Sequence, residues 1–177
     1  MRVARAKDSL TLIFKAAEGR VLRRIVLSIS QNYLLRPGEM DAKAAAVWYS
    51  TNGCEKAKMS AEETREWLAQ LHQLKCGHLR LLQAWEQQLA HPAAAQCELR
   101  LTLEEAAGLV TVLNDHRLLA AARNDIGQDE MRLHSLPALG NLRAAQQTAL
   151  YEIHFLGYLI EEILRALPHN CADWQER

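Results

Sequence analysis

Two segments that lie far apart in the sequence share one pattern, a short run of alternating apolar residues followed directly by a helical run. In the first segment Leu10, Leu12 and Phe14 alternate with other residues. In the second, residues 97–101 read CELRL and alternate in the same way. Alternation is typical of a strand with one buried face, whereas apolar spacing by three and four is typical of an amphipathic helix.

A shift of 87 residues superimposes the two patterns and defines a weak internal repeat. The equivalent pairs are Leu12 and Leu99, Phe14 and Leu101, Glu18 and Glu105, Leu22 and Leu109, Ile25 and Val112, and Val26 and Leu113. Lys15 stands in the first copy where the helix-capping Thr102 stands in the second. Because an isolated strand is unstable in water, we expect the two strands to pair with each other against the helices. The direction of pairing stays open.

Length and charge exclude several classes of protein. The chain has 177 residues, the size of one domain, and 49% of them are hydrophobic, which is too many for a disordered tail. Lys and Arg number 21 and Asp and Glu number 21, so no global positive field would hold a polyanion. Nucleic acid is therefore a disfavoured partner.

The N-terminal residues and the cysteines indicate the cellular compartment of the protein. Residues 1–7 are basic, but the apolar run over 10–14 is too short for an export signal or a membrane span. The cysteines, which number 4, form no CxxC pair and fit reduced thiols. We expect a cytoplasmic protein with no membrane partner.

The periodicity predicts one mainly helical domain over residues 1–177, α+β by strict count, with about five helices and a small two-stranded sheet. The expected elements are a strand at 8–15, helices at 17–35, 41–49 and 60–90, a strand at 97–101, a helix at 103–124, a loop at 125–141, a helix at 142–167 and a tail at 168–177. Residues 51–53 read as a turn.

The predicted helix at 60–90 is unusually long. Ser60 and Glu63 have the capping-box spacing, and a leucine and aromatic stripe extends from Trp67 to Leu89. Whether this helix is interrupted stays open, and Gly77 is where we expect a bend or a break if there is one. The stripe could pack inside the domain or seal a homodimer, and the sequence leaves both open.

Several motifs resemble one uncharacterised bacterial family. These are Leu113-Asn-Asp-His-Arg-Leu118, then Arg123 and Ile126, the preceding residues 101–105, and Leu156-Gly-Tyr-Leu159. In order and spacing they are similar to the domain of unknown function family two-thousand-seventeen over nearly the whole chain. The chain departs from that family at Ile153 and His154, where a tyrosine and an aspartate are usual, and at residues 121–126, where a Gly-Thr-Arg-Leu-Gly-Ile string is usual.

The resemblance implies a genomic context but no biochemical activity. Genes of the family often lie beside the gene for ClpS, the adaptor that hands substrates to a Clp protease, and some members have been labelled transcriptional regulators. It therefore implies an accessory in regulated proteolysis.

A buried polar pairing is one hypothesis for the helix at 103–124. His116 and Arg123 lie on one side of this helix, and Glu152 lies within the apolar arc of the last helix. A carboxylate on a core face must be paired, neutral or at the rim. We therefore expect Glu152 to meet Arg123 or His116, the alternative being a peripheral Glu152 whose carboxylate reaches water.

The motif residues Asn114, Asp115 and Arg117 are the second candidate. Asn114 and Arg117 are neighbours at i and i+3, and the arginine fork suits a carboxylate or phosphate, so the three could form a recognition patch. An internal polar network is the structural alternative, and we favour it.

Metal and catalytic signals are weak. His72 and Cys76 lie one helical turn apart, as two zinc ligands can, but no second ligand pair is nearby. Nucleophile motifs and glycine-rich phosphate loops are absent. We expect no metal, no cofactor and no catalytic residues.

The functional expectation is thus a non-enzymatic bacterial cytosolic protein that binds another protein. Two alternatives stay open. Lys15, Arg20, Arg23 and Arg24 could form a basic patch for a DNA-associated regulator, and the helical core could hold a small ligand or a metal.

Overall fold

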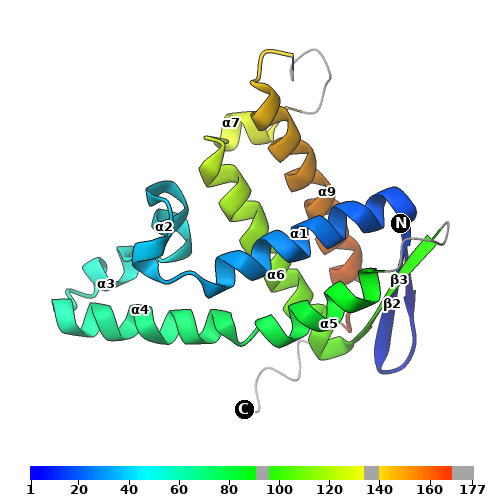
Figure 1. Ribbon diagram of the computed structural model, residues 1–177, viewed down its shortest axis with the longest axis horizontal. Coiled ribbons are helices and arrows are strands. Elements are labelled where there is room, and N and C mark those ends of the chain that lie inside the picture. Colours follow the sequence, from blue (N-terminus) through cyan, green and yellow to red (C-terminus); the bar gives the residue numbers. More distant parts are fainter. Residues whose placement is uncertain (91–95, 134–139, 169–177) are drawn as a thin grey trace.

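The computed structural model describes residues 1–90, 96–133 and 140–168, which are mainly helical with a small antiparallel sheet at one end (Figure 1). The strands are β1 (Arg2–Arg5), β2 (Ser9–Lys15) and β3 (Gln96–Thr102). The helical segments are α1 (Ala16–Leu34), the 3-10 turn η1 (Pro37–Glu39), α2 (Ala42–Trp48), α3 (Asn52–Lys56), α4 (Ala61–Cys76), α5 (Leu79–Leu89), α6 (Leu103–Arg123), α7 (Gln128–Met131) and α9 (Ala144–Ala166). The mainly helical fold class is confirmed.

The two strands of the repeat pair with each other, as the sequence predicts. β2 and β3 are antiparallel, and Leu12 faces Leu99, its equivalent in the repeat. The alternation puts one face of the pair into the core, because the following side chains are all buried: Leu10, Leu12, Phe14, Cys97, Leu99 and Leu101. The helix that follows each strand packs back over this face.

Within the described residues the sheet has three strands, so the expectation of two is wrong. β1 pairs antiparallel with the free edge of β2, placing Val3 opposite Leu12. Its sequence, RVAR, carries no apolar alternation, and three of its four residues are exposed. An edge strand of this kind is held by backbone hydrogen bonds, which leave little trace in a hydrophobic pattern.

The expected single helix at 60–90 is two helices, with the break at the predicted glycine. α4 ends at Cys76, and α5 begins at Leu79 after Gly77 and His78. The break also divides the apolar stripe between the two helices. α5 buries Leu82, Trp85 and Leu89, whereas α4 buries no residue along its whole length. Residues 91–95, at the expected end of this helix, lie outside the described part.

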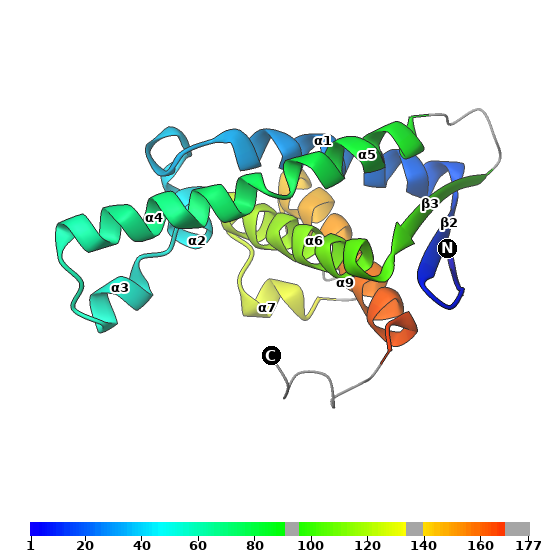
Figure 2. The same ribbon diagram turned by 90° about the horizontal axis from the view of Figure 1, so that it is seen from below.

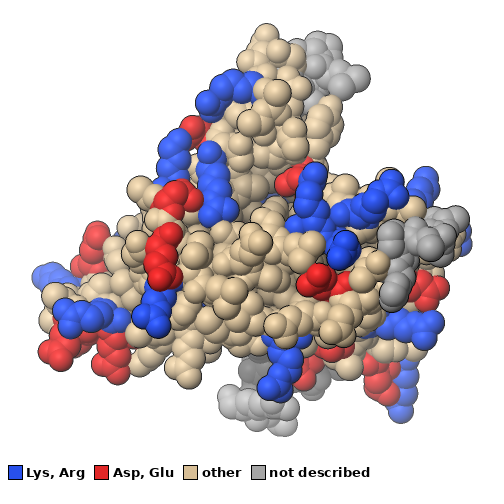
Figure 3. All heavy atoms as spheres, in the orientation of Figure 1, with Lys and Arg blue, Asp and Glu red and all other residues tan. Residues whose placement is uncertain are grey.

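The helices form a core that extends away from the sheet. α5 packs beside α1, α6 packs beside α9, and α2 contacts α6 (Figure 2). α2, α3 and the start of α4 lie at the end opposite the sheet (Figure 1). Charged side chains of both signs are interspersed over the face seen in Figure 3. The largest fully buried side chains include Trp85, Tyr33 and Phe14.

Two further short helices correct the sequence-based assignment. α3 begins at Asn52 where a turn was expected, and α7 lies inside the expected loop at 125–141. Each is about one turn long and buries one residue or none, so neither can produce a periodic pattern. Residues 134–139 of that loop and 169–177 of the expected tail lie outside the described part.

Gly19 allows α1 to pack closely against β3. A Cβ at this position would lie 2.1 Å from the Sγ of Cys97. We predict that Gly19→Ala lowers the free energy of unfolding by about 1–3 kcal/mol through overpacking. In a Cys97→Ala background the same change should cost little, because the sulfur is gone and alanine favours a helix. Urea unfolding of the parent, both single variants and the double variant measures this coupling, and additive effects would contradict the contact.

Candidate functional site

Asp115 lies at a junction of three helices. Its Oδ2 accepts a hydrogen bond of 2.7 Å from the Tyr33 hydroxyl of α1 and forms an ion pair of 3.2 Å with Lys75 Nζ of α4. The side chains of Lys75 and Asp115 are only 14% and 16% exposed. Partly desolvated charges of this kind interact more strongly than surface pairs, so this cluster fixes α4 to α1 and α6.

Aromatic rings surround the same ion pair. Lys75 Nζ lies 3.9 Å from the ring centroid of Trp48 in α2, and the Tyr33 and Trp48 rings lie 5.1 Å apart. Burial, followed by the charge of Asp115 and the hydrogen bond to it, raises the pKa of Tyr33, so its hydroxyl remains a donor. The cation–π contact adds α2 to the helices joined at this point. We call Tyr33, Trp48, Lys75 and Asp115 the Asp115 cluster.

The side chains of the three residues in the expected recognition patch point away from α6 in different directions. Asn114 is exposed, and Asp115 faces α1 and α4. Arg117 lies against α9, where a Cβ on Gly157 would come within 3.5 Å of its Nη2. The structure therefore does not bring the three side chains together. Gly157 leaves space for the guanidinium between the two helices.

Of the residues expected in a polar pairing, the structure pairs Glu152 with His116, whereas Arg123 pairs with other residues. His116 Nε2 lies 3.5 Å from Glu152 Oε2, and Arg24 of α1 pairs with the other carboxylate oxygen. Arg123 instead donates to Asn32 of α1 at 2.8 Å and to Asp41 before α2 at 3.0 Å. Arg24 was not expected here, because its helix is remote in sequence.

The contact with His116 lowers the pKa of Glu152 below its usual value. Burial opposes this shift, and the charge of Arg24 adds to it. The Glu152 side chain is 19% exposed and lines a hollow of about 360 Å³ between α6 and α9, together with His116 and Arg123. Glu152 is thus held as a carboxylate at the rim of the core.

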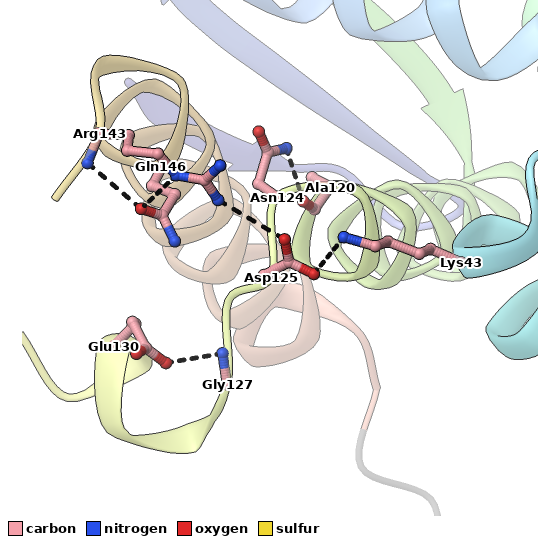
Figure 4. Close-up of polar contacts among 8 residues, drawn as sticks. All are labelled: Lys43, Ala120, Asn124, Asp125, Gly127, Glu130, Arg143 and Gln146. Atoms are coloured by element: carbon pink, nitrogen blue, oxygen red, sulfur yellow. Dashed lines mark hydrogen bonds and ion pairs between the residues drawn. The ribbon is translucent and has the colours of Figure 1, made fainter.

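A second ion-pair network lies just after the C-terminal end of α6 (Figure 4). Asp125 follows this helix with a φ of 52°, a left-handed conformation that aspartate tolerates better than most residues. Its carboxylate lies between Lys43 of α2 and Arg143, which precedes α9, and the ion pair with Arg143 is 3.5 Å long. The hydrogen bond and charge of Lys43 lower the pKa of Asp125. The network links α2, α6 and α9.

His72 and Cys76 are neighbours, with the sulfur 3.5 Å from Nε2. The other ring nitrogen of His72 lies 2.8 Å from the hydroxyl of Tyr49, and Cys76 donates to the Tyr33 carbonyl at 3.3 Å. Both residues thus bind neighbouring protein groups. Within the described ranges, no three His, Cys, Asp or Glu side chains gather as metal ligands would.

Comparison with known proteins identifies no relative: no family model, no curated protein and no solved structure matches the chain. Across residues 1–90, 96–133 and 140–168, no helix combines the length and hydropathy needed to cross a lipid bilayer.

We predict that Asp115→Ala lowers the free energy of unfolding by about 2–4 kcal/mol, because it leaves the largely buried Lys75 without its counter-ion. The matched control is Asn114→Ala, at an exposed neighbouring position on the same helix, which should change stability by less than about 0.5 kcal/mol. Urea denaturation measures both. Equal, small effects would show that the Asp115 cluster contributes little.

Glu152→Gln should lower the melting temperature at neutral pH, where the carboxylate is paired. A carboxyl group with a lowered folded pKa stabilises the protein above its unfolded pKa of about 4.3 and loses that contribution as the pH falls through the folded value. The difference between parent and variant should therefore narrow in strong acid. Glu161→Gln, which alters an exposed pair with Arg165, is the control. An unchanged melting temperature at pH 7 would contradict a stabilising role for Glu152.

Proposed function

We propose that this chain is a non-enzymatic protein that binds another protein, and that α4 carries the contact surface. The observation that supports this is the exposure of α4, a helix of 16 residues without a buried residue. Trp67 is 37% exposed and Leu74 is 72% exposed. These residues lie seven positions apart, so they share one side of the helix.

α4 is held firmly at one end despite its exposure. Lys75 joins the Asp115 cluster, and Cys76 donates to the Tyr33 carbonyl in α1. A partner would therefore meet a helix that is already formed and oriented, and less conformational entropy is lost on binding. Tryptophan and leucine on such a surface supply apolar area to bury.

The charge distribution favours a protein partner over DNA. Two arginines of the suspected basic patch are paired with acids, Arg23 with Glu86 at 3.7 Å and Arg24 with Glu152. Lys and Arg are interspersed with Asp and Glu on the face shown in Figure 3. Sequence-independent binding to a duplex depends on a local excess of unpaired cations.

A link to regulated proteolysis is part of the proposal and rests only on the resemblance to the family whose genes often lie beside that of ClpS. Purified ClpS is therefore the first defined partner to test by calorimetry. Heat of binding that is lost on changing α4 would support the link, and no binding would remove it.

The proposed surface is tested by comparing the parent with the Trp67→Ala, Leu74→Ala double variant in capture from native cell extract. The variant should keep its fold, because neither side chain is buried, and lose the specific partner. Leu164→Ala changes a residue that is 46% exposed on α9 and is the control. Light scattering of the same proteins shows whether the partner is a second copy. Identical capture by all three proteins would contradict a role for α4.

A further inference from the structure

Asn52 and Gly53 stand at the start of α3, at the end of the molecule opposite the sheet (Figure 1). Both residues are exposed. Among the residues that the structure describes, neither the Asn52 carboxamide nor the Gly53 amide N–H has a hydrogen-bond partner. Thr51, which precedes them at the N-cap, makes no capping bond, because its hydroxyl donates to Glu55 at 3.2 Å. The first amides of a helix then remain unsatisfied.

The order asparagine then glycine places a backbone nitrogen next to a side-chain amide carbon. Attack of the Gly53 nitrogen on Asn52 Cγ closes a ring of five atoms, which is a favourable ring size. Glycine has no side chain to hinder this approach and leaves the backbone free to rotate. A Cβ built on Gly53 would meet nothing within 4 Å, so no neighbouring group blocks the nitrogen. Asparagine is among the thermolabile residues.

Ring closure requires Asn52 to leave its helical backbone conformation, and α3 opposes this only weakly. The helix has 5 residues, whereas an isolated helix needs about 12–15 residues to be even marginally stable in water. A backbone hydrogen bond of 3.0 Å from Glu55 to Thr51 closes its first turn. Cys54 is the one residue that α3 buries. Local opening of this turn therefore costs little free energy.

We propose that Asn52 is a site of spontaneous deamidation through a succinimide. The Gly53 nitrogen loses its proton and bonds to Asn52 Cγ, the Cγ–Nδ2 bond breaks, and ammonia leaves with a proton taken up in exchange. Water then opens the ring at one of its two carbonyl carbons. Cleavage of the new Cγ–N bond gives aspartate, and cleavage of the original peptide bond gives isoaspartate. The net reaction consumes one water and releases one ammonia, without oxidation or reduction.

The isoaspartate product changes α3 more than the aspartate product does. In isoaspartate the main chain runs through Cγ and gains one carbon, so the helical spacing of backbone groups is lost at this residue. Cys54, which is 3% exposed, lies two positions further on and should become accessible. Either product adds a negative charge to the exposed start of α3. The inference goes beyond the proposed function and is independent of it, because it needs no partner.

Incubation of the folded protein in mildly alkaline buffer, followed by peptide mapping and mass spectrometry, tests the site. The peptide that contains Asn52 should gain one mass unit and split into aspartyl and isoaspartyl forms. The rate should rise with pH, because the attacking nitrogen must lose its proton. Asn114 is the internal control. It is also exposed, but the amide after it lies in the interior of α6, where helical hydrogen bonds engage each N–H.

Two comparisons separate the effect of sequence from that of structure. Gly53→Ala should slow the reaction severalfold and keep the fold, because the added Cβ meets open space. Incubation in urea gives the rate for the unfolded chain, and the folded parent should react at a rate within severalfold of it. An unmodified Asn52 in the folded protein, or equal rates in parent and Gly53→Ala, would overturn the proposal.

Alkylation of Cys54 by iodoacetamide measures the structural consequence. Labelling of Cys54 should increase in proportion to isoaspartate in the parent and stay low in Gly53→Ala. Labelling that does not follow isoaspartate would overturn the assigned opening of α3.

Discussion

The antiparallel pairing of β2 with β3 is the constraint on which the rest of the structure depends. It joins residues 9–15 to residues 96–102 and so brings together the two strand-and-helix units of the repeat. The buried face that the two strands form needs a cover, which α1, α5 and α6 supply. Because α1 and α6 each start directly after a paired strand, the pairing sets where both helices begin.

The Asp115 cluster divides this interior from the exposed part of the molecule. On its core side α5 buries Trp85, and on its other side α4 has no fully buried residue, although Leu68 and Leu71 pack partly buried against the core. An ion pair that is 14% and 16% exposed, with a tyrosine hydroxyl and a tryptophan ring around it, fixes the C-terminal end of α4, while Trp67 and Leu74 on the outer flank stay exposed. Our proposal that Trp67 and Leu74 on α4 form a contact surface follows from this arrangement.

The sequence predicts the elements well and their surroundings poorly, for physical reasons. Alternation and helical periodicity depend on local spacing, so they located β2, β3, α1 and α6, and the low helix propensity of glycine marked Gly77 as the place for a break. The same periodicity describes α4 and α5, although only α5 is buried, because a stripe does not reveal whether anything covers it. β1 was missed because backbone pairing holds it. The partners of Asp115, Tyr33 and Lys75, lie 82 and 40 residues away in the sequence, so no local pattern reveals them.

Native-state hydrogen exchange resolved by NMR tests the central claim, that one paired core fixes the C-terminal end of α4 more firmly than the rest of that helix. Amides of β2, β3, α1 and α6 should exchange only through global unfolding, with one common free energy. Amides of α4 before Lys75 should exchange at a clearly lower free energy of opening. Exchange of β2 and β3 at separate free energies, or protection of all of α4 equal to that of the core, would contradict the account.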